Sequence, residues 1–196
     1  MTSIIAVAGS LRRQSWNRRL AAEAARLGPT AGLDVSVFNG LADIPLFDQD
    51  LDDSLVAGPP GVEAVRAQVR AADGILIATP EYNQSIPGVM KNLVDWLSRP
   101  EDQGVLEGKP VAIIGATDGP WGTRYAQKEL RHTLTAAGAL VLPQPMLFVA
   151  RAPDLFDAGG RLTDAVTKRR LTELLRAFDR WIGLMSALSH VDAVAG

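Results

Sequence analysis

The chain has 196 residues, of which 47% are apolar, and its formal net charge is −2. A charge this close to zero provides no electrostatic basis for binding nucleic acid or a membrane surface. The sequence contains no cysteine, which excludes disulfides, thiol nucleophiles and thiolate metal sites.

The length predicts a single domain over residues 1–185, followed by a tail at 186–196 that has no clear period and that we expect to fray. No stretch approaches the roughly 20 apolar residues of a membrane span. The apolar run at residues 4–8 is far too short for a secretory signal, and its positive charges come after it. We therefore expect a cytoplasmic protein.

Strand and helix patterns alternate along the chain. Apolar runs predict strands at residues 3–8, 34–38, 74–78 and 109–115, and a fifth strand region at 139–142 and 146–149 that two prolines interrupt. Apolar residues at helical spacing predict helices at about residues 15–27, 62–72, 87–99, 123–137 and from 163 onward, where Thr163 and Asp164 can form a cap. This alternation indicates an α/β fold with a doubly wound parallel sheet and helices on both faces.

The connector at residues 39–61 is long and irregular, and it carries five aspartates between Asp43 and Asp53. Connectors of this length are usually functional or disordered. The apolar residues at 44–47 favour a connector that packs on the fold.

The loop at residues 79–86 follows a buried strand and precedes a helix that Pro87 can open. Ligands of open parallel sheets bind at this carboxyl end of the strands. The loop carries five polar residues in succession, from Glu81 to Ser85, with a proline on each side. A plain turn needs only one or two such residues, so the loop is a candidate binding segment.

A second polar loop, residues 9–17, joins the first strand to the first helix. Its hydroxyl, guanidinium and amide donors lie beside the free N–H groups of a helix start, a combination that binds phosphate. Arg12, Arg13, Arg18 and Arg19 crowd the positive end of the helix dipole, which is unfavourable unless an anion binds there. The alternative is a solvated basic turn with a serine cap.

Two motifs carry a resemblance to a known family. The first motif is TPEYN-Q-S-x-P-G with K-N-x-x-D-W, at residues 79–96, and it resembles the flavin-ring loop of the NADPH-dependent FMN reductases. The second motif is G-S-L-R-x-x-S-x-N, at residues 9–17, and it resembles the FMN-phosphate loop of the same family. The resemblance implies a flavodoxin-like fold with five parallel strands in the order 2-1-3-4-5, in which strands one and three are neighbours. It assigns the FMN phosphate to Ser10, Arg12, Ser15 and Asn17, and it leaves Arg13 and Gln14 at variable positions.

The same resemblance places the flavin ring at Pro80, Glu81, Tyr82, Asn83 and Ser85, with backbone groups of Tyr82 and Asn83 bonded to the ring edge. A third loop, residues 116–123, resembles the glycine-rich loop of the family, so that Gly119 and Trp121 are further cofactor-binding candidates. A tight Asp-Gly-Pro turn stays open as the alternative for this loop.

The function implied is that of an FMN-dependent NAD(P)H oxidoreductase, with NADPH or NADH as donor. Its acceptors would be quinones, nitro or azo compounds, metal oxyanions or free flavin. One open ring face cannot stack a nicotinamide and an acceptor together, which predicts ping-pong kinetics. No side chain is expected to be catalytic, because hydride transfer to a flavin does not require Glu81 as a base. The alternatives are a flavodoxin-like electron carrier, which is typically more acidic, and a regulatory module that has lost its flavin.

We also expect a homodimer, or a tetramer, because the helix at 87–99 is apolar over more than one stripe. The residues concerned are Val89, Met90, Leu93, Val94, Trp96 and Leu97. The two histidines, His132 and His190, lack nearby spaced carboxylates, so no metal site is predicted.

Overall fold

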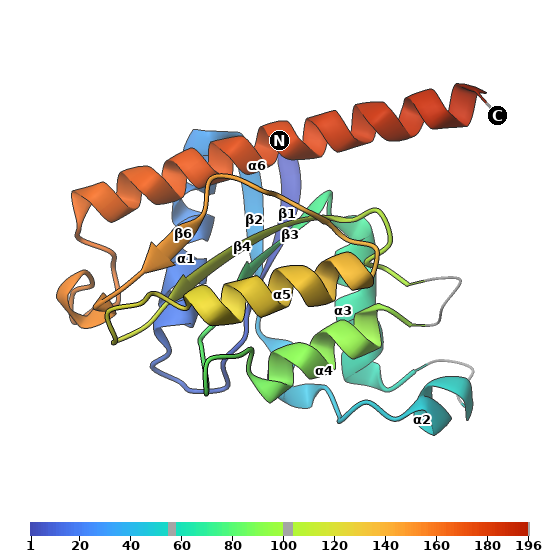
Figure 1. Ribbon diagram of the computed structural model, residues 1–196, viewed down its shortest axis with the longest axis horizontal. Helices are drawn as coiled ribbons and strands as arrows, with labels where there is room; N and C mark the ends of the chain where they lie inside the picture. Colours follow the sequence, from blue (N-terminus) through green and yellow to red (C-terminus); the bar gives the residue numbers. More distant parts are fainter. Residues whose placement is uncertain (55–57, 100–103, 196) are drawn as a thin grey trace.

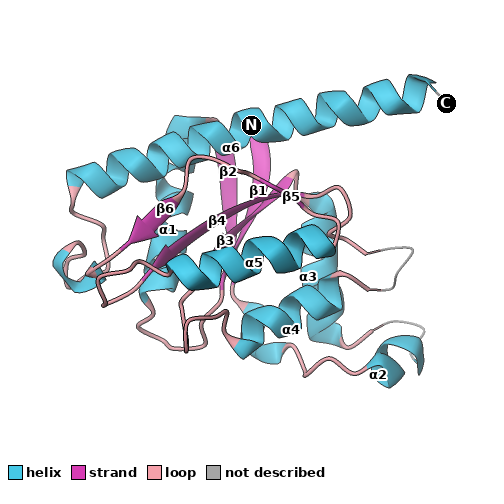
Figure 2. Ribbon diagram, viewed as in Figure 1, coloured by secondary structure: helices cyan, strands magenta, loops and turns pink. Residues whose placement is uncertain are grey.

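A parallel β-sheet runs through the centre of the protein (Figure 1, Figure 2). The structure is a computed structural model that describes residues 1–54, 58–99 and 104–195. The strands are β1 (Thr2–Ala8), β2 (Leu33–Phe38), β3 (Gly74–Ala78), β4 (Pro110–Ala116), β5 (Leu140–Val141) and β6 (Leu147–Val149). Their order is β2-β1-β3-β4-β5, and β6 also pairs with β4. The predicted order 2-1-3-4-5 is confirmed.

β5 and β6 lie one after the other along the same edge of β4. Leu140 of β5 pairs with Pro110, and Leu147 of β6 pairs with Ile114. Pro143 and Pro145 lie between the two strands, where they cannot donate to a ladder. The interrupted fifth strand region is therefore two short strands, as its prolines predict.

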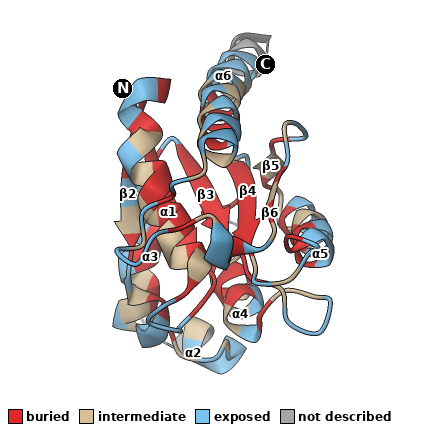
Figure 3. Ribbon diagram, turned by 90° about the vertical axis from the view of Figure 1, so that its left-hand side faces the viewer, coloured by how far each residue is buried: buried red, intermediate tan, exposed pale blue. Residues whose placement is uncertain are grey.

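Helices cover both faces of the sheet. They are α1 (Trp16–Leu27), α2 (Gln49–Ser54), α3 (Pro60–Ala71), α4 (Gly88–Leu97), α5 (Arg124–Ala136) and α6 (Ala165–Ala195). Alternate residues of β1 point to opposite faces, so Ile4 and Ala6 pack with α1 and α6, whereas Ile5 and Val7 pack with α3, α4 and α5. Figure 3 shows buried residues along the strands and along the inner sides of these helices.

Helical spacing predicts Tyr125, Leu130 and Leu134 as inward residues of α5, and this prediction is wrong for one of the three. Leu130 and Leu134 are buried as expected, but Tyr125 is 52% exposed. Tyr125 lies five residues before Leu130, a spacing that turns its side chain well away from the buried stripe. Ala126, four residues before Leu130, occupies the inward position instead and is fully buried.

The connector after β2 packs against α4, as its apolar residues predict. Asn92 accepts a hydrogen bond from the Phe47 backbone N–H (2.7 Å) and donates to the Pro45 carbonyl (2.8 Å). The indole of Trp96 also donates to Pro45, and its ring meets the Phe47 ring edge-on at 5.0 Å between centroids. The wide apolar surface of α4 is the reason to expect a second subunit. At Trp96 this surface is covered by the chain's own connector.

The last helix, α6, begins where the sequence predicts. Asp164 accepts a 2.7 Å hydrogen bond from the Thr167 backbone N–H and so caps the first turn. The helix continues to Ala195 and extends beyond the sheet in Figure 1. Fraying from residue 186 onward stays a prediction, and Gly196 and the His190 side chain lie outside the described residues. Within the described ranges no helix is both long and apolar enough to span a membrane.

Candidate functional site

Three loops meet at the carboxyl edge of the sheet, because β1, β3 and β4 are parallel neighbours. A pocket of about 160 Å³ lies between them. Its lining comes from the loops after β1 (Ser10, Arg12, Ser15, Trp16, Asn17), β3 (Pro80, Glu81, Tyr82) and β4 (Ala116, Thr117, Asp118).

Most of the cofactor-binding residues predicted from the sequence line this pocket. Every residue predicted to hold a phosphate belongs to this lining. Pro80, Glu81 and Tyr82 also belong to it. The other predicted cofactor-binding residues, Asn83, Ser85, Gly119 and Trp121, are not part of the lining of this pocket.

Two buried serines line the pocket. Ser15 caps α1, since its Oγ accepts the backbone N–H groups of Asn17 (3.2 Å) and Arg18 (3.4 Å). Ser10 Oγ accepts the Arg12 backbone N–H at 3.4 Å. In both contacts the hydroxyl acts as acceptor, so each proton stays available for a ligand oxygen.

Asn17 has a structural role at the back of the pocket. Its Nδ2 donates to the Ala116 carbonyl (2.9 Å), and its Oδ1 accepts the Ala116 N–H (2.8 Å). This reciprocal pair fixes the loop after β1 to the end of β4. A primary amide has two N–H groups, so only one is left for the predicted phosphate contact.

Trp16 was not assigned a role from the sequence, yet it lines the pocket. Its indole Nε1 is buried and has no hydrogen-bond partner among the described residues. The ring is held by Phe156 at 5.6 Å between centroids and by the Arg19 guanidinium at 4.6 Å. A buried donor without an acceptor costs about 1–3 kcal/mol, and a ligand oxygen would remove that cost. The residue fills a variable position between Ser15 and Asn17, so the motif gave no reason to select it.

Arg12 lies on the exposed rim of the pocket. Its Nη2 donates to the Gln14 carbonyl at 3.0 Å. This contact stays within the loop and leaves the other guanidinium N–H groups for an anion.

Glu81 ties the loop after β3 to the start of α5. Its Oε2 accepts the backbone N–H groups of Tyr125 (2.8 Å) and Ala126 (3.1 Å). Thr123, at the N-cap position, makes no side-chain cap and has a positive φ of 64°. The carboxylate of Glu81 therefore caps α5 from another loop and suits the positive end of the helix dipole.

The segment from Tyr82 to Ser85 is a tight hairpin turn. Tyr82 and Ser85 exchange backbone hydrogen bonds of 3.1 and 3.0 Å, and Asn83 and Gln84 both have positive φ (51° and 61°). Positive φ at both central residues is typical of a type I′ turn. The Tyr82 N–H and carbonyl are both used inside this turn. The bond from backbone groups of Tyr82 and Asn83 to a ring edge stays a prediction.

Comparisons with known proteins agree with the motifs. A family model described as NADPH-dependent FMN reductase matches residues 2–154. An NAD(P)H-dependent FMN reductase of Pseudomonas aeruginosa is 40% identical over 179 residues, covering 91% of this chain and 94% of that protein. A 2-hydroxy-1,4-benzoquinone reductase of a Burkholderia species is 39% identical over 180 residues, covering 91% and 95%.

A solved structure is similar over nearly the whole chain. FerB from Paracoccus denitrificans, described as a flavoenzyme NAD(P)H:(acceptor) oxidoreductase, superposes with a TM-score of 0.85. It is 30% identical, and the match covers 94% of this chain and 99% of FerB. The sheet, its loops and these relatives agree, and the chain belongs to the NADPH-dependent FMN reductase family of oxidoreductases.

Proposed function

We propose that the protein is an FMN-dependent NAD(P)H oxidoreductase that holds the flavin phosphate in the pocket between the loops after β1, β3 and β4. The observation that carries this proposal is the set of unused donors at that pocket. They are the indole N–H of Trp16 and the hydroxyl protons of Ser10 and Ser15. A phosphate group supplies the acceptors that these donors lack, so the residues fit the cofactor that the family implies.

The protein binds and orients, and the cofactor supplies the redox chemistry. FMN, when bound, accepts a hydride from a nicotinamide and delivers electrons to an acceptor. Ser10, Ser15 and Trp16 would hold the phosphate. The Tyr82–Ser85 turn would position the ring edge, and Glu81 fixes that turn relative to α5. No side chain of the pocket has to move a proton for hydride transfer.

Donor and acceptor would use the same open face in turn, which gives ping-pong kinetics. Initial rates measured against NADPH at several fixed concentrations of 1,4-benzoquinone test this order. Parallel lines in a reciprocal plot are expected. Intersecting lines would require both substrates to be bound together and would contradict the shared face. Absence of NADPH oxidation would favour a flavodoxin-like electron carrier.

Among the acceptors that the resemblance implies, we favour quinones over nitro compounds, azo compounds, metal oxyanions and free flavin. Tyr82 lines the pocket with 53% of its surface exposed, and Trp121, on the loop after β4, is 65% exposed. Flat exposed aromatic rings suit a planar, apolar acceptor. The ratio kcat/KM for benzoquinone, compared with chromate and a nitroarene, measures the preference.

We also propose that the protein forms a homodimer or tetramer and acts in the cytoplasm. The support for assembly is the exposed apolar surface near the pocket, where Tyr82, Trp121 and Tyr125 are each more than half exposed. Light scattering is expected to give a multiple of the chain mass of 20.9 kDa. A monomer at micromolar concentration would contradict the assembly, and cell fractionation tests the location.

A further inference from the structure

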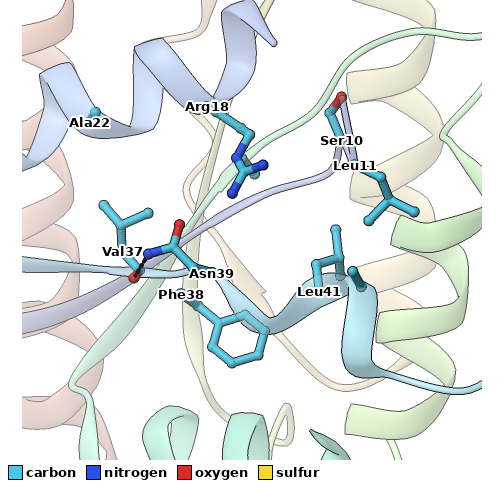
Figure 4. A pocket seen from close by; sticks show the side chains of 10 residues that line it. Ser10, Leu11, Arg18, Ala22, Val37, Phe38, Asn39 and Leu41 are labelled. Carbon is cyan, nitrogen blue, oxygen red and sulfur yellow. Dashed lines mark hydrogen bonds between the residues drawn. The ribbon is translucent and has the colours of Figure 1, made fainter. Parts of the chain in front are cut away.

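A second cavity, of about 240 Å³, lies at the same edge of the sheet, on the other side of the loop after β1 (Figure 4). Its walls include Ser10 and Leu11 after β1, Arg18 of α1, and Phe38, Asn39 and Leu41 at and after the end of β2. Because β1 pairs with β2 on one side and with β3 on the other, the two cavities flank the same loop. Ser10 lines both of them.

The charge in this cavity comes from Arg18. Its side chain points into the space toward Asn39 (Figure 4), and its guanidinium makes no hydrogen bond or ion pair with the residues that the structure describes. Two other arginines nearby are engaged, Arg12 with the Gln14 carbonyl and Arg19 with the Trp16 ring. Asn39 is oriented by a 3.2 Å hydrogen bond from its Nδ2 to the Val37 carbonyl.

This chemistry selects an anion with several oxygen atoms. A guanidinium presents its donors in a planar fork that matches phosphate and carboxylate. No carboxylate belongs to the described lining, and Phe38 and Leu41 are buried apolar walls.

The volume and position indicate that the cavity takes one group of a larger ligand. About 240 Å³ is below the range of roughly 300–1,000 Å³ that is typical of sites for whole small molecules. The flavin phosphate already has a set of donors in the neighbouring pocket, so a second anion site next to it serves a different molecule. In an NAD(P)H oxidoreductase, that molecule is the dinucleotide donor, whose nicotinamide end must reach the flavin.

We propose that this cavity binds the 2′-phosphate of NADPH and that Arg18, with Asn39, makes the protein prefer NADPH to NADH. The inference rests on the proposed function, since it takes the electron donor to be a nicotinamide dinucleotide. NADH carries a hydroxyl at that position and would leave the guanidinium without an anionic partner. Arginine is the usual means by which nucleotide sites accommodate a 2′-phosphate.

The test compares two nucleotides that differ only at the 2′ position. Calorimetric titration of the FMN-loaded protein with 2′,5′-ADP and with 5′-AMP is expected to show that 2′,5′-ADP binds at least about tenfold more tightly, the effect of one charge-assisted hydrogen bond. Arg18→Gln should abolish this difference, and Arg18→Lys should restore part of it. The matched control is Arg13→Gln, an exposed arginine of the same loop that lines neither cavity.

Steady-state kinetics give a second readout. Arg18→Gln is expected to lower kcat/KM for NADPH by about tenfold and to leave the value for NADH unchanged. An equal loss with both donors would overturn the proposal, as would an unchanged ratio. A variant that loses FMN affinity together with 2′,5′-ADP affinity would show that the cavity belongs to the flavin phosphate.

Two further results separate the possible explanations. If inorganic phosphate binds the wild-type protein as tightly as 2′,5′-ADP does, the cavity is a free-phosphate site and the proposal is overturned. If 2′,5′-ADP binding depends on Arg18 but NADPH is not oxidised, the proposed activity fails while the assignment of the cavity is supported. Thermal unfolding of each variant shows whether the fold is intact.

Discussion

Some polar side chains around the pocket after β1 have hydrogen-bond partners within the protein, and others do not. Asn17 bonds the Ala116 backbone with both ends of its amide, and the Glu81 carboxylate bonds the start of α5. The indole N–H of Trp16 has no such partner within the described chain. This contrast separates residues that shape the site from residues that are available to a ligand.

Trp16→Phe is expected to weaken FMN binding by about 1.5–3 kcal/mol, because it removes a donor to a charged group but keeps the ring contacts. The stability of the flavin-free protein should not fall, since the donor removed has no acceptor there. Fluorescence titration with FMN and urea unfolding measure the two effects. Trp181→Phe is the control, because the Trp181 indole donates to the Leu140 carbonyl at 2.9 Å. That variant should lose stability and keep its FMN affinity, and the opposite pattern would contradict the role of Trp16.

Glu81→Ala is expected to lower the free energy of unfolding by about 0.5–2 kcal/mol, the usual effect of losing a helix cap. Glu81→Gln keeps an oxygen acceptor for Tyr125 and Ala126 and should lose only the charge contribution, about 0.3–1 kcal/mol. Because no proton has to move, the single-turnover rate with NADPH should change little in the Gln variant. A loss of a hundredfold or more would instead identify Glu81 as a general base.

At the scale of elements, a buried ion pair connects α2, α3 and α4. Arg66 of α3 contacts Asp52 of α2 at 2.9 Å, with both side chains at most 4% exposed, and it also donates to the Trp96 carbonyl at 2.9 Å. Glu63 adds a second contact at 2.8 Å. One of the aspartates in the acidic connector therefore has a structural role.

Asp52→Ala should lower the free energy of unfolding by about 3 kcal/mol, since removing one partner leaves a buried cation. The loss lies at the lower end of that range because Glu63 remains. Asp50→Ala, an exposed aspartate of the same helix, should change stability by less than about 0.5 kcal/mol. Equal midpoints of urea unfolding for the two variants would show that the pair contributes nothing.

The cap of α6 predicts a dependence on pH. Hydrogen bonds from the side chain and backbone of Thr167 hold the pKa of Asp164 below its ordinary value of 3.8. A lowered pKa in the folded state means that the carboxylate stabilises the fold above pH 3.8 and that this contribution disappears as the pH falls through the folded value. Asp164→Ala should therefore be less stable than wild type at pH 7, and the gap should close below pH 3.8. A gap in urea midpoints that stays constant from pH 7 to pH 3 would contradict this.

The elements with a strong local pattern were predictable from the sequence. β3 occupies residues 74–78 as expected, and α1 begins at Trp16, within one residue of its predicted start. α2 was not predicted, because a six-residue helix without apolar period depends on tertiary contacts such as the Arg66–Asp52 pair. The apolar width of α4 predicts a second subunit, and the part of it that the connector covers at Trp96 cannot be read from local spacing.

At the scale of the whole molecule, the motifs predicted which loops meet, since β1 and β3 were expected to be neighbours. They did not predict how individual side chains are used. Glu81 reaches a helix 44 residues further along the chain. The cavity at Arg18 exists only because β2 brings Asn39 beside α1. Such relations depend on the assembled sheet, which no local motif encodes.

We propose that the pocket between the three strand ends holds the phosphate of FMN. Titration of the flavin-free protein with FMN and with riboflavin, which lacks the phosphate, tests this most directly. FMN is expected to bind at least about 100-fold more tightly than riboflavin, since several donors each contribute about 1.5–3 kcal/mol. Arg12→Ala should weaken FMN binding by about 1.5–3 kcal/mol, the contribution of one hydrogen bond to a charged group, and should leave riboflavin binding unchanged. Equal affinity of the wild-type protein for FMN and riboflavin would contradict the claim.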